Sequence, residues 1–150
     1  MQDPGRFTVA VFQDASWARR GLAALARAGF SSESLTIVAK NSVDTASLVH
    51  DTLGQACEPL DLSGIGPALA RGPLVEALQG SAADFATLGL AGTMRRVGFQ
   101  AHDARIYDAL TARGGVLVAV RDEPRAADAL AIFFSYGGAN AAIGAWAGRV

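Results

Sequence analysis

The sequence has few of the side chains that most often carry chemistry in proteins. It contains one cysteine, Cys57, and two histidines, His50 and His102, in 150 residues. One cysteine cannot form an intramolecular disulfide, and these three residues lack the spacing of a zinc site. The nucleophile motif G-x-S-x-G is also absent. We therefore expect no metal, no cofactor and no catalytic residues, and interpret the chain as non-enzymatic.

The chain also lacks an excess of charge of either sign. Thirteen Lys and Arg residues against fourteen Asp and Glu residues give a formal net charge of −1. Such a chain has no broad positive field to attract nucleic acid or anionic lipid, so neither partner is expected. The start MQDPGRFTVAV has no basic segment and no long apolar run, unlike a secretion signal. Together with the cysteine usage, this predicts a cytoplasmic protein.

Apolar residues are abundant instead. The chain is 51% hydrophobic and only 18% charged, which is apolar for a soluble protein and indicates surface buried against another molecule. Its length is typical of one domain, residues 1–150. We expect this domain to form a homo-oligomer, in the simplest case a dimer, or to dock on a protein partner.

The N-terminal part of the chain has a β-α-β pattern. Residues 6–13 alternate as a strand, Asp14 is placed to cap the helix that follows, and Gly29 is placed to end it. A second strand, SLTIVAK at residues 34–40, completes the unit, which spans residues 6–40.

Residues 114–148 repeat this pattern. A constant offset along the chain pairs Val9 with Val118 and Gly29 with Gly138. Two such units in one sheet predict an α/β fold, a ferredoxin-like split βαβ pair with a four-stranded, mainly antiparallel sheet. The buried stripe of the second helix is expected to consist of Ala127, Leu130, Ala131 and Phe134.

One face of that sheet is left without a helix from either unit. The side chains expected to point toward it are Ala10, Phe12, Val38, Leu117 and Ala119, which form a surface too apolar to stand in water. Either a partner or the middle of the chain must cover this face.

Residues 41–113 form this middle segment, a mostly helical insertion between the two units. Helical spacing predicts short helices near its start and from Pro73, and a longer one over residues 101–113. Residues 63–74 contain several glycines and prolines, so we expect them to be extended or turn-like and unsuited to a central strand.

Three blocks of sequence occur in a characteristic order. The block GFQAHDARIYDALTARGGVLVAV, residues 98–120, contains Gly98, Ala104, Arg105 and Tyr107 ahead of a Gly-Gly-Val-Leu-Val-Ala-Val strand. Residues 64–78 and 9–40 supply the other two blocks. Together they resemble the bacterial general stress protein family of the 17M-like type. The resemblance implies a stress-associated module that acts through self-association or by docking on a partner protein, without an assigned activity.

The chain departs from that family in one segment. Many relatives carry a long glycine zipper before the Ala-Arg-x-Tyr helix, whereas residues 80–99 are short and contain Asp84, Arg95 and Arg96. Charges of this kind oppose entry into a bilayer, so membrane insertion of this segment is not expected.

The uncharged residues 129–148 are the most unusual stretch of the sequence. Their length would span a bilayer, but Gly137, Gly138 and Asn140 interrupt them where a turn is expected. We interpret the stretch as a helix followed by an edge strand. Its large rings are too many for so small a pair of elements to hide, and they are expected in a subunit interface. These residues are Phe133, Tyr136 and Trp146.

His102, Arg105 and Tyr107 are the candidate ligand-binding residues. The alternative to an interaction module is a regulatory domain that binds a small molecule in a pocket near the helix containing residues 104–110. Helix capping and burial of Tyr107 are the structural explanation of the same residues. The segment Gly64-Ile65-Gly66-Pro67 is interpreted as a turn, because the continuation of a phosphate-binding loop is missing.

Overall fold

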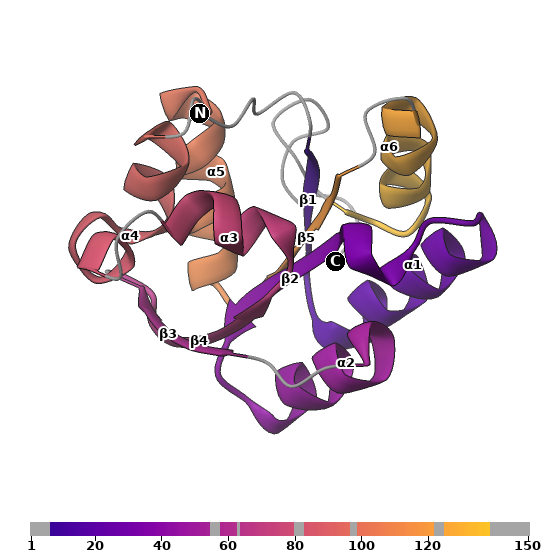
Figure 1. The fold of residues 1–150 in the computed structure, drawn as a ribbon, viewed down its shortest axis with the longest axis horizontal. Helices are drawn as coiled ribbons and strands as arrows, with labels where there is room; N and C mark the ends of the chain where they lie inside the picture. Colours follow the sequence, from indigo (N-terminus) through magenta and orange to yellow (C-terminus); the bar gives the residue numbers. More distant parts are fainter. Residues whose placement is uncertain are drawn as a thin grey trace.

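Five strands form one antiparallel sheet in the computed structural model, which describes residues 7–54, 58–62, 64–79, 83–96, 99–121 and 125–138. The strands are β1 (Thr8–Phe12), β2 (Leu35–Lys40), β3 (Glu58–Leu62), β4 (Gly66–Arg71) and β5 (Val116–Val120). Their order across the sheet is β1-β5-β2-β4-β3 (Figure 1). Each pair of neighbouring strands is antiparallel.

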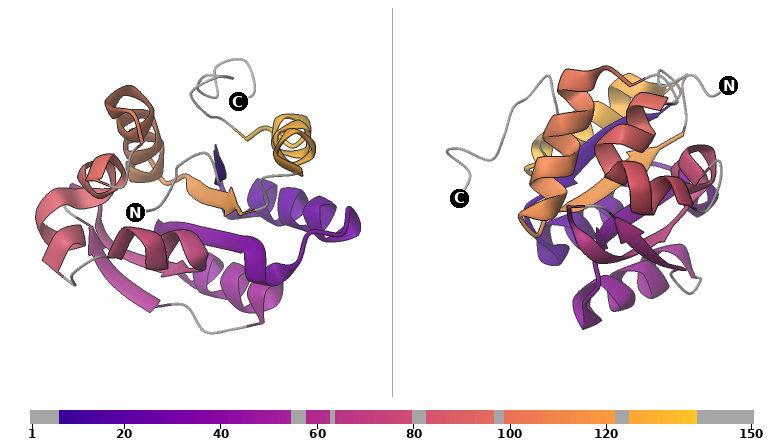
Figure 2. Two further views of the ribbon diagram at one scale, coloured as in Figure 1. Left: turned by 45° about the horizontal axis from the view of Figure 1, so that its top comes forward. Right: turned by 90° about the vertical axis from the view of Figure 1, so that its left-hand side faces the viewer.

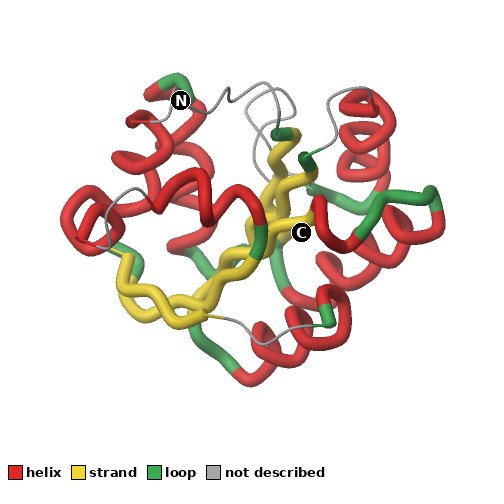
Figure 3. Tube along the Cα trace, viewed as in Figure 1, coloured by secondary structure: helices red, strands yellow, loops and turns green. Residues whose placement is uncertain are grey.

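Helices cover both faces of this sheet. In the described part of the chain they are α1 (Ala15–Arg27), α2 (Val43–Leu53), α3 (Pro73–Gln79), α4 (Ala83–Arg96), α5 (Ala101–Ala112) and α6 (Ala126–Ser135), with a short 3-10 turn, η2 (Ser32–Ser34). Helices α1, α2 and α6 share one apolar core with the sheet, and α3, α4 and α5 share the other. Figure 2 shows the two groups on opposite sides, and Figure 3 shows the strands enclosed between them.

The predicted α/β class and antiparallel sheet are confirmed, but the sheet has five strands where four were expected. The two additional strands, β3 and β4, come from the middle segment and extend the sheet beyond β2. The expected strand near Trp146 lies outside the described residues.

Strand β4 corrects the interpretation of the Gly- and Pro-rich segment. It lies between β2 and β3, a central position that the prolines argued against. Pro67 is tolerated because it precedes the last β2 pair, Lys40 with Ala68, and its carbonyl accepts a hydrogen bond from the amide of Asn41 at 3.1 Å. Since the carbonyl of Pro67 faces β2, the N–H that proline lacks would face β2 as well, beyond the last residue pair of the β2–β4 ladder, while Pro67 stays paired with Asp61 of β3.

The prediction that Ala10 and Leu117 point to the same face of the sheet was wrong, because Ala10 points to the opposite face. Strand β1 pairs with β5 so that Ala10 lies opposite Val118, and Val11 opposite Leu117. Opposed residues share a face, so Leu117 packs with Val11 in the core of α3, α4 and α5, while Ala10 packs with α1, α2 and α6. The middle of the chain thus supplies the cover for the apolar face.

The two helix ends show that the repeat aligns Gly29 with Gly137, and not with Gly138 as predicted. Gly29 and Gly137 both adopt a left-handed conformation, with φ of 94° and 81°. The amide that follows each glycine bonds back to the helix, from Phe30 to the Leu25 carbonyl at 3.1 Å and from Gly138 to the Phe133 carbonyl at 2.7 Å. These are the same turn, the Schellman motif, at equivalent places in the two halves.

This shift of one residue rotates the predicted buried stripe of α6 by about 100°. Phe133, the counterpart of Leu25, is fully buried, whereas Phe134 is 61% exposed. Ala127 and Ala131 are exposed as well, so the predicted stripe was wrong. Ala129 and Phe133 are the buried positions of α6.

Candidate functional site

Two capped helices, α1 and α2, form the walls of a cleft on one side of the sheet. The Asp14 carboxylate accepts a hydrogen bond from the Trp17 amide at 2.9 Å, which fixes the start of α1. The Ser42 hydroxyl accepts from the Thr45 amide at 3.0 Å at the start of α2, and Gly54 ends that helix with φ of 68°. Local sequence therefore sets where both walls begin and end.

The cleft has an apolar floor. It encloses about 290 Å³ and is lined by Arg19, Leu22, Ala23, Ala26, Phe30, Ser32, Leu35, Asp51 and Thr52. The floor residues Leu22, Phe30 and Leu35 are buried. The guanidinium of Arg125 lies over the Phe30 ring, 4.1 Å from its centroid, and so holds the ring in place.

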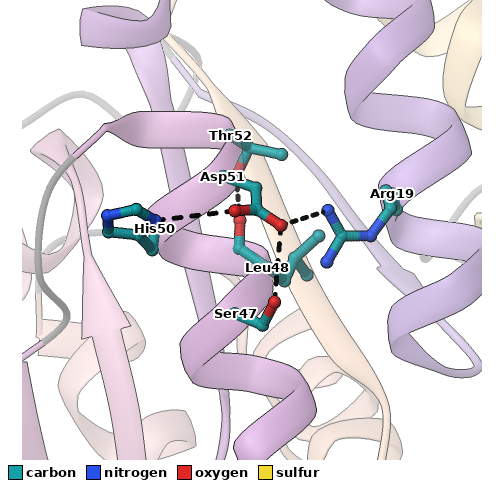
Figure 4. A network of polar contacts seen from close by, with 6 residues as sticks. All are labelled: Arg19, Ser47, Leu48, His50, Asp51 and Thr52. Carbon is teal, nitrogen blue, oxygen red and sulfur yellow. Dashed lines mark hydrogen bonds and ion pairs between the residues drawn. The ribbon is translucent and has the colours of Figure 1, made fainter.

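Asp51 is the centre of a polar network at the rim of the cleft. Its carboxylate accepts hydrogen bonds from the Arg19 guanidinium at 2.9 Å and the Ser47 hydroxyl at 3.3 Å, both on Oδ2 (Figure 4). The His50 Nδ1 lies 3.5 Å from the other oxygen, Oδ1. The hydrogen bond from Arg19, followed by that from His50, holds the pKa of Asp51 below its ordinary value. The network fixes the charges at the rim, and because it is half-exposed it adds little to stability.

The order of groups in this network differs from that of a nucleophile activated by a base. In a Ser-His-Asp triad the imidazole stands between the hydroxyl and the carboxylate. Here the Asp51 carboxylate binds both the Ser47 hydroxyl and the His50 ring. The arrangement therefore positions charges and does not activate Ser47.

A charged crevice adjoins the cleft. It encloses about 320 Å³ and is lined by Ser32, Glu33, Leu35, Leu53, Arg71, Gly72, Pro73, Glu76 and Arg121. Its walls are fixed from inside the fold, because the buried Thr36 hydroxyl accepts a hydrogen bond from the Leu74 amide at 2.9 Å and anchors the start of α3. At its edge the Arg71 guanidinium pairs with Glu58 at 3.0 Å.

The residues predicted to bind a ligand lie apart from this cleft, on α5. His102 and Arg105 are exposed and line an open depression, whereas Tyr107 is buried against the sheet. Helix α5 thus directs Tyr107 into the core and the other two side chains toward solvent.

The predicted interface residues occupy different environments. Phe133 is fully buried, and its ring meets that of Phe12 edge to face at 5.8 Å, so this chain already accommodates its bulk. Tyr136 is half-buried, and its hydroxyl accepts a hydrogen bond from Arg27 at 3.4 Å. Trp146 lies outside the described residues.

The cleft itself was missed from the sequence. Arg19 and Asp51 are 32 residues apart in the chain, and each alone reads as a charged residue on the solvated face of a helix. The useful signal was the spacing of Arg19, Ala23 and Ala26, which leaves small side chains beside a charge on one face of α1.

Within the ranges that the structure describes, no group of three or more His, Cys, Asp or Glu side chains is placed to hold a metal ion. In the same ranges no helix combines the length and the apolar character needed to cross a membrane. In the comparisons with known proteins, the chain matches no family model, no curated protein and no solved structure.

Proposed function

We propose that the chain is a non-catalytic binding module that takes a small amphipathic molecule in the cleft between α1 and α2. The observation that carries this proposal is the cleft itself, an apolar floor with the Arg19–Asp51 ion pair at its rim. Small-molecule sites in proteins have this composition, an apolar lining with a few polar groups that orient the ligand, and volumes of about 300–1,000 Å³. The cleft together with the adjoining crevice falls in that range.

Filling the cleft tests the proposal. Ala26 lies on the exposed face of α1 and lines the cleft, so Ala26→Phe adds a ring to the cavity without removing any core contact. Ala109→Phe is the matched control, an exposed alanine on α5 that lines the depression beside His102 and Arg105. Both variants and the parent are screened against a metabolite panel by thermal shift, and native mass spectrometry identifies any ligand that co-purifies.

We expect a ligand whose thermal shift is lost in Ala26→Phe and kept in Ala109→Phe. A thermal shift that is lost in Ala109→Phe and kept in Ala26→Phe would place the site on α5, beside the ligand-binding residues predicted from the sequence. A panel without any ligand would refute the small-molecule proposal.

A second candidate function is self-association, the stress-associated role that the family resemblance implies. Its supporting observation is Phe134, a large apolar side chain that is 61% exposed on α6. Side chains of this kind are enriched where proteins meet. Sedimentation velocity of the parent and of Phe134→Ser tests it: a dimer that dissociates in the variant supports self-association, and a monomeric parent contradicts it.

The ferredoxin-like arrangement also belongs to this proposal. The order β1-β5-β2 and the two matching helix ends, at Gly29 and Gly137, support two related βαβ halves. The fourth strand of that arrangement lies outside the described residues.

A further inference from the structure

The apolar cleft and the charged crevice form one continuous depression. Ser32 and Leu35 line both of them, so the two cavities meet at the beginning of β2. A ligand lying across this junction would place one end among the apolar side chains of α1 and the other among charged side chains. The depression therefore selects a molecule with an apolar part and a charged part next to each other.

The charged end presents both signs in equal number. Arg71 and Arg121 line it together with Glu33 and Glu76. A simple anion would meet two carboxylates there, and a simple cation would meet two guanidinium groups, so either would be repelled as well as attracted. A zwitterion satisfies both kinds of group.

Arg121 and Glu33 are the members best placed to contact a ligand at the junction. The backbone amide of Arg121 donates to the Ser34 carbonyl at 2.9 Å, which fixes the end of β5 beside η2, the turn that carries Glu33. Arg71 is engaged with Glu58, whereas Arg121 makes no ion pair within the part of the chain that the structure describes. Glu33 adjoins Ser32, one of the two junction residues.

We infer that the depression binds a free α-amino acid with an aliphatic or aromatic side chain. The guanidinium of Arg121 takes the α-carboxylate, Glu33 takes the α-ammonium group, and the apolar side chain lies in the cleft over Leu22 and Phe30. This inference rests on the proposed small-molecule function and gives its ligand class.

Four probes separate the parts of such a ligand. L-leucine carries all three groups, 4-methylpentanoate lacks the ammonium group, 3-methylbutylamine lacks the carboxylate, and glycine lacks the side chain. Binding to the full chain is measured by calorimetry and by amide chemical shifts in NMR titrations. We expect L-leucine to bind about tenfold or more tightly than each of the other three, because each lacks one charged hydrogen-bonding group or the apolar contact.

Variants assign the contacts. Arg121→Ala removes an exposed side chain and Glu33→Gln removes the charge of one, and each is expected to weaken L-leucine binding about tenfold. Arg95→Ala removes another exposed arginine, in the last turn of α4 and outside both cavities, and is expected to bind as the parent does. Amide spectra of each variant confirm that the fold is retained.

The outcomes separate this inference from the proposal beneath it. Equal binding of L-leucine and the truncated probes, or parent-like binding by both Arg121→Ala and Glu33→Gln, would overturn the amino-acid inference. Binding of a ligand that is not a zwitterion, lost in Ala26→Phe, would overturn it as well and leave the cleft as the site. If no small molecule binds, both fall.

Discussion

Helix α4 depends on a cap from a side chain of another helix, α5. Removing that cap tests how much it contributes to the stability of the fold. Gly89 has φ of 71° and ψ of −175°, which are not helical values, so α4 is two helical segments joined at a kink. The second segment has a new N-terminus with unpaired amides. The Asp108 carboxylate, on α5, accepts a hydrogen bond from one of them, Ala91, at 3.0 Å.

We expect Asp108→Ala to lower the free energy of unfolding by about 1–2 kcal/mol. Loss of a side-chain cap costs about 1 kcal/mol, and loss of a negative charge at a helix N-terminus adds about 0.3–1 kcal/mol. Leu90 and Met94, on either side of Ala91 in this second segment, are buried, so fraying there would also loosen the core. Urea unfolding followed by circular dichroism measures the change, and a fall of about 2–8 °C in Tm should accompany it.

Two further variants make this test decisive. Asp108→Asn keeps an oxygen acceptor. Its loss in free energy of unfolding should be less than half of that of Asp108→Ala, because asparagine caps helices nearly as well as aspartate. Asp61→Ala removes an exposed carboxylate from β3 and should change stability by less than about 0.5 kcal/mol. If Asp108→Ala is as stable as the parent, the cross-helix cap contributes nothing. If Asp108→Asn is as unstable as Asp108→Ala, the charge and not the hydrogen bond accounts for the effect.

Three other predictions follow from burial and charge. Gly21→Ala should destabilise by about 1–3 kcal/mol in urea unfolding despite its better helix propensity, because the added methyl would lie 2.7 Å from Cζ of the buried Phe12 ring; a gain in stability would refute this packing. Phe133→Ala should cost about 3–5 kcal/mol and Phe134→Ala less than about 0.5 kcal/mol, and similar losses for both would contradict the alignment of Gly29 with Gly137. Because the pKa of Asp51 is lowered in the folded state, its contribution to stability is complete above the unfolded-state pKa and is lost as the pH falls through the lower folded value. Titration of that carboxyl by NMR should show a pKa below that of unfolded aspartate, and an ordinary value would show that the network does not form.

The parts of the fold that depend on neighbouring residues were predictable from the sequence. Asp14 sets the start of α1 and Gly29 sets its end, both through contacts within a few residues. Pro73 begins α3, because its fixed φ suits the first position of a helix. The repeat was also visible, but its register was ambiguous because Gly137 and Gly138 are adjacent and both suit a helix end. Only the left-handed φ of Gly137 decides between them.

Features that depend on distant residues were not predictable in the same way. The central place of β4 depends on its pairing with β2, a strand well separated from it in the chain, and this pairing overrides the local preference of Pro67. The cleft depends on Arg19 meeting Asp51 across two helices. In both cases the residues that make the contact are visible in the sequence, but local patterns do not indicate which distant residues pair with each other.

The alignment of Gly29 with Gly137 also relates a residue of the cleft to its counterpart in the second half of the chain. It makes Ala26 of α1 the counterpart of Phe134 of α6, and both positions are exposed. In the first half the small side chain leaves room beside α2, a helix from the middle segment that packs on α1 and supplies Asp51. Ala26→Phe therefore copies a side chain that the equivalent position already carries. Because Ala26 is exposed and makes no core contact, loss of ligand binding in this variant, with an unchanged amide spectrum elsewhere, would report the filled cleft and not a damaged helix.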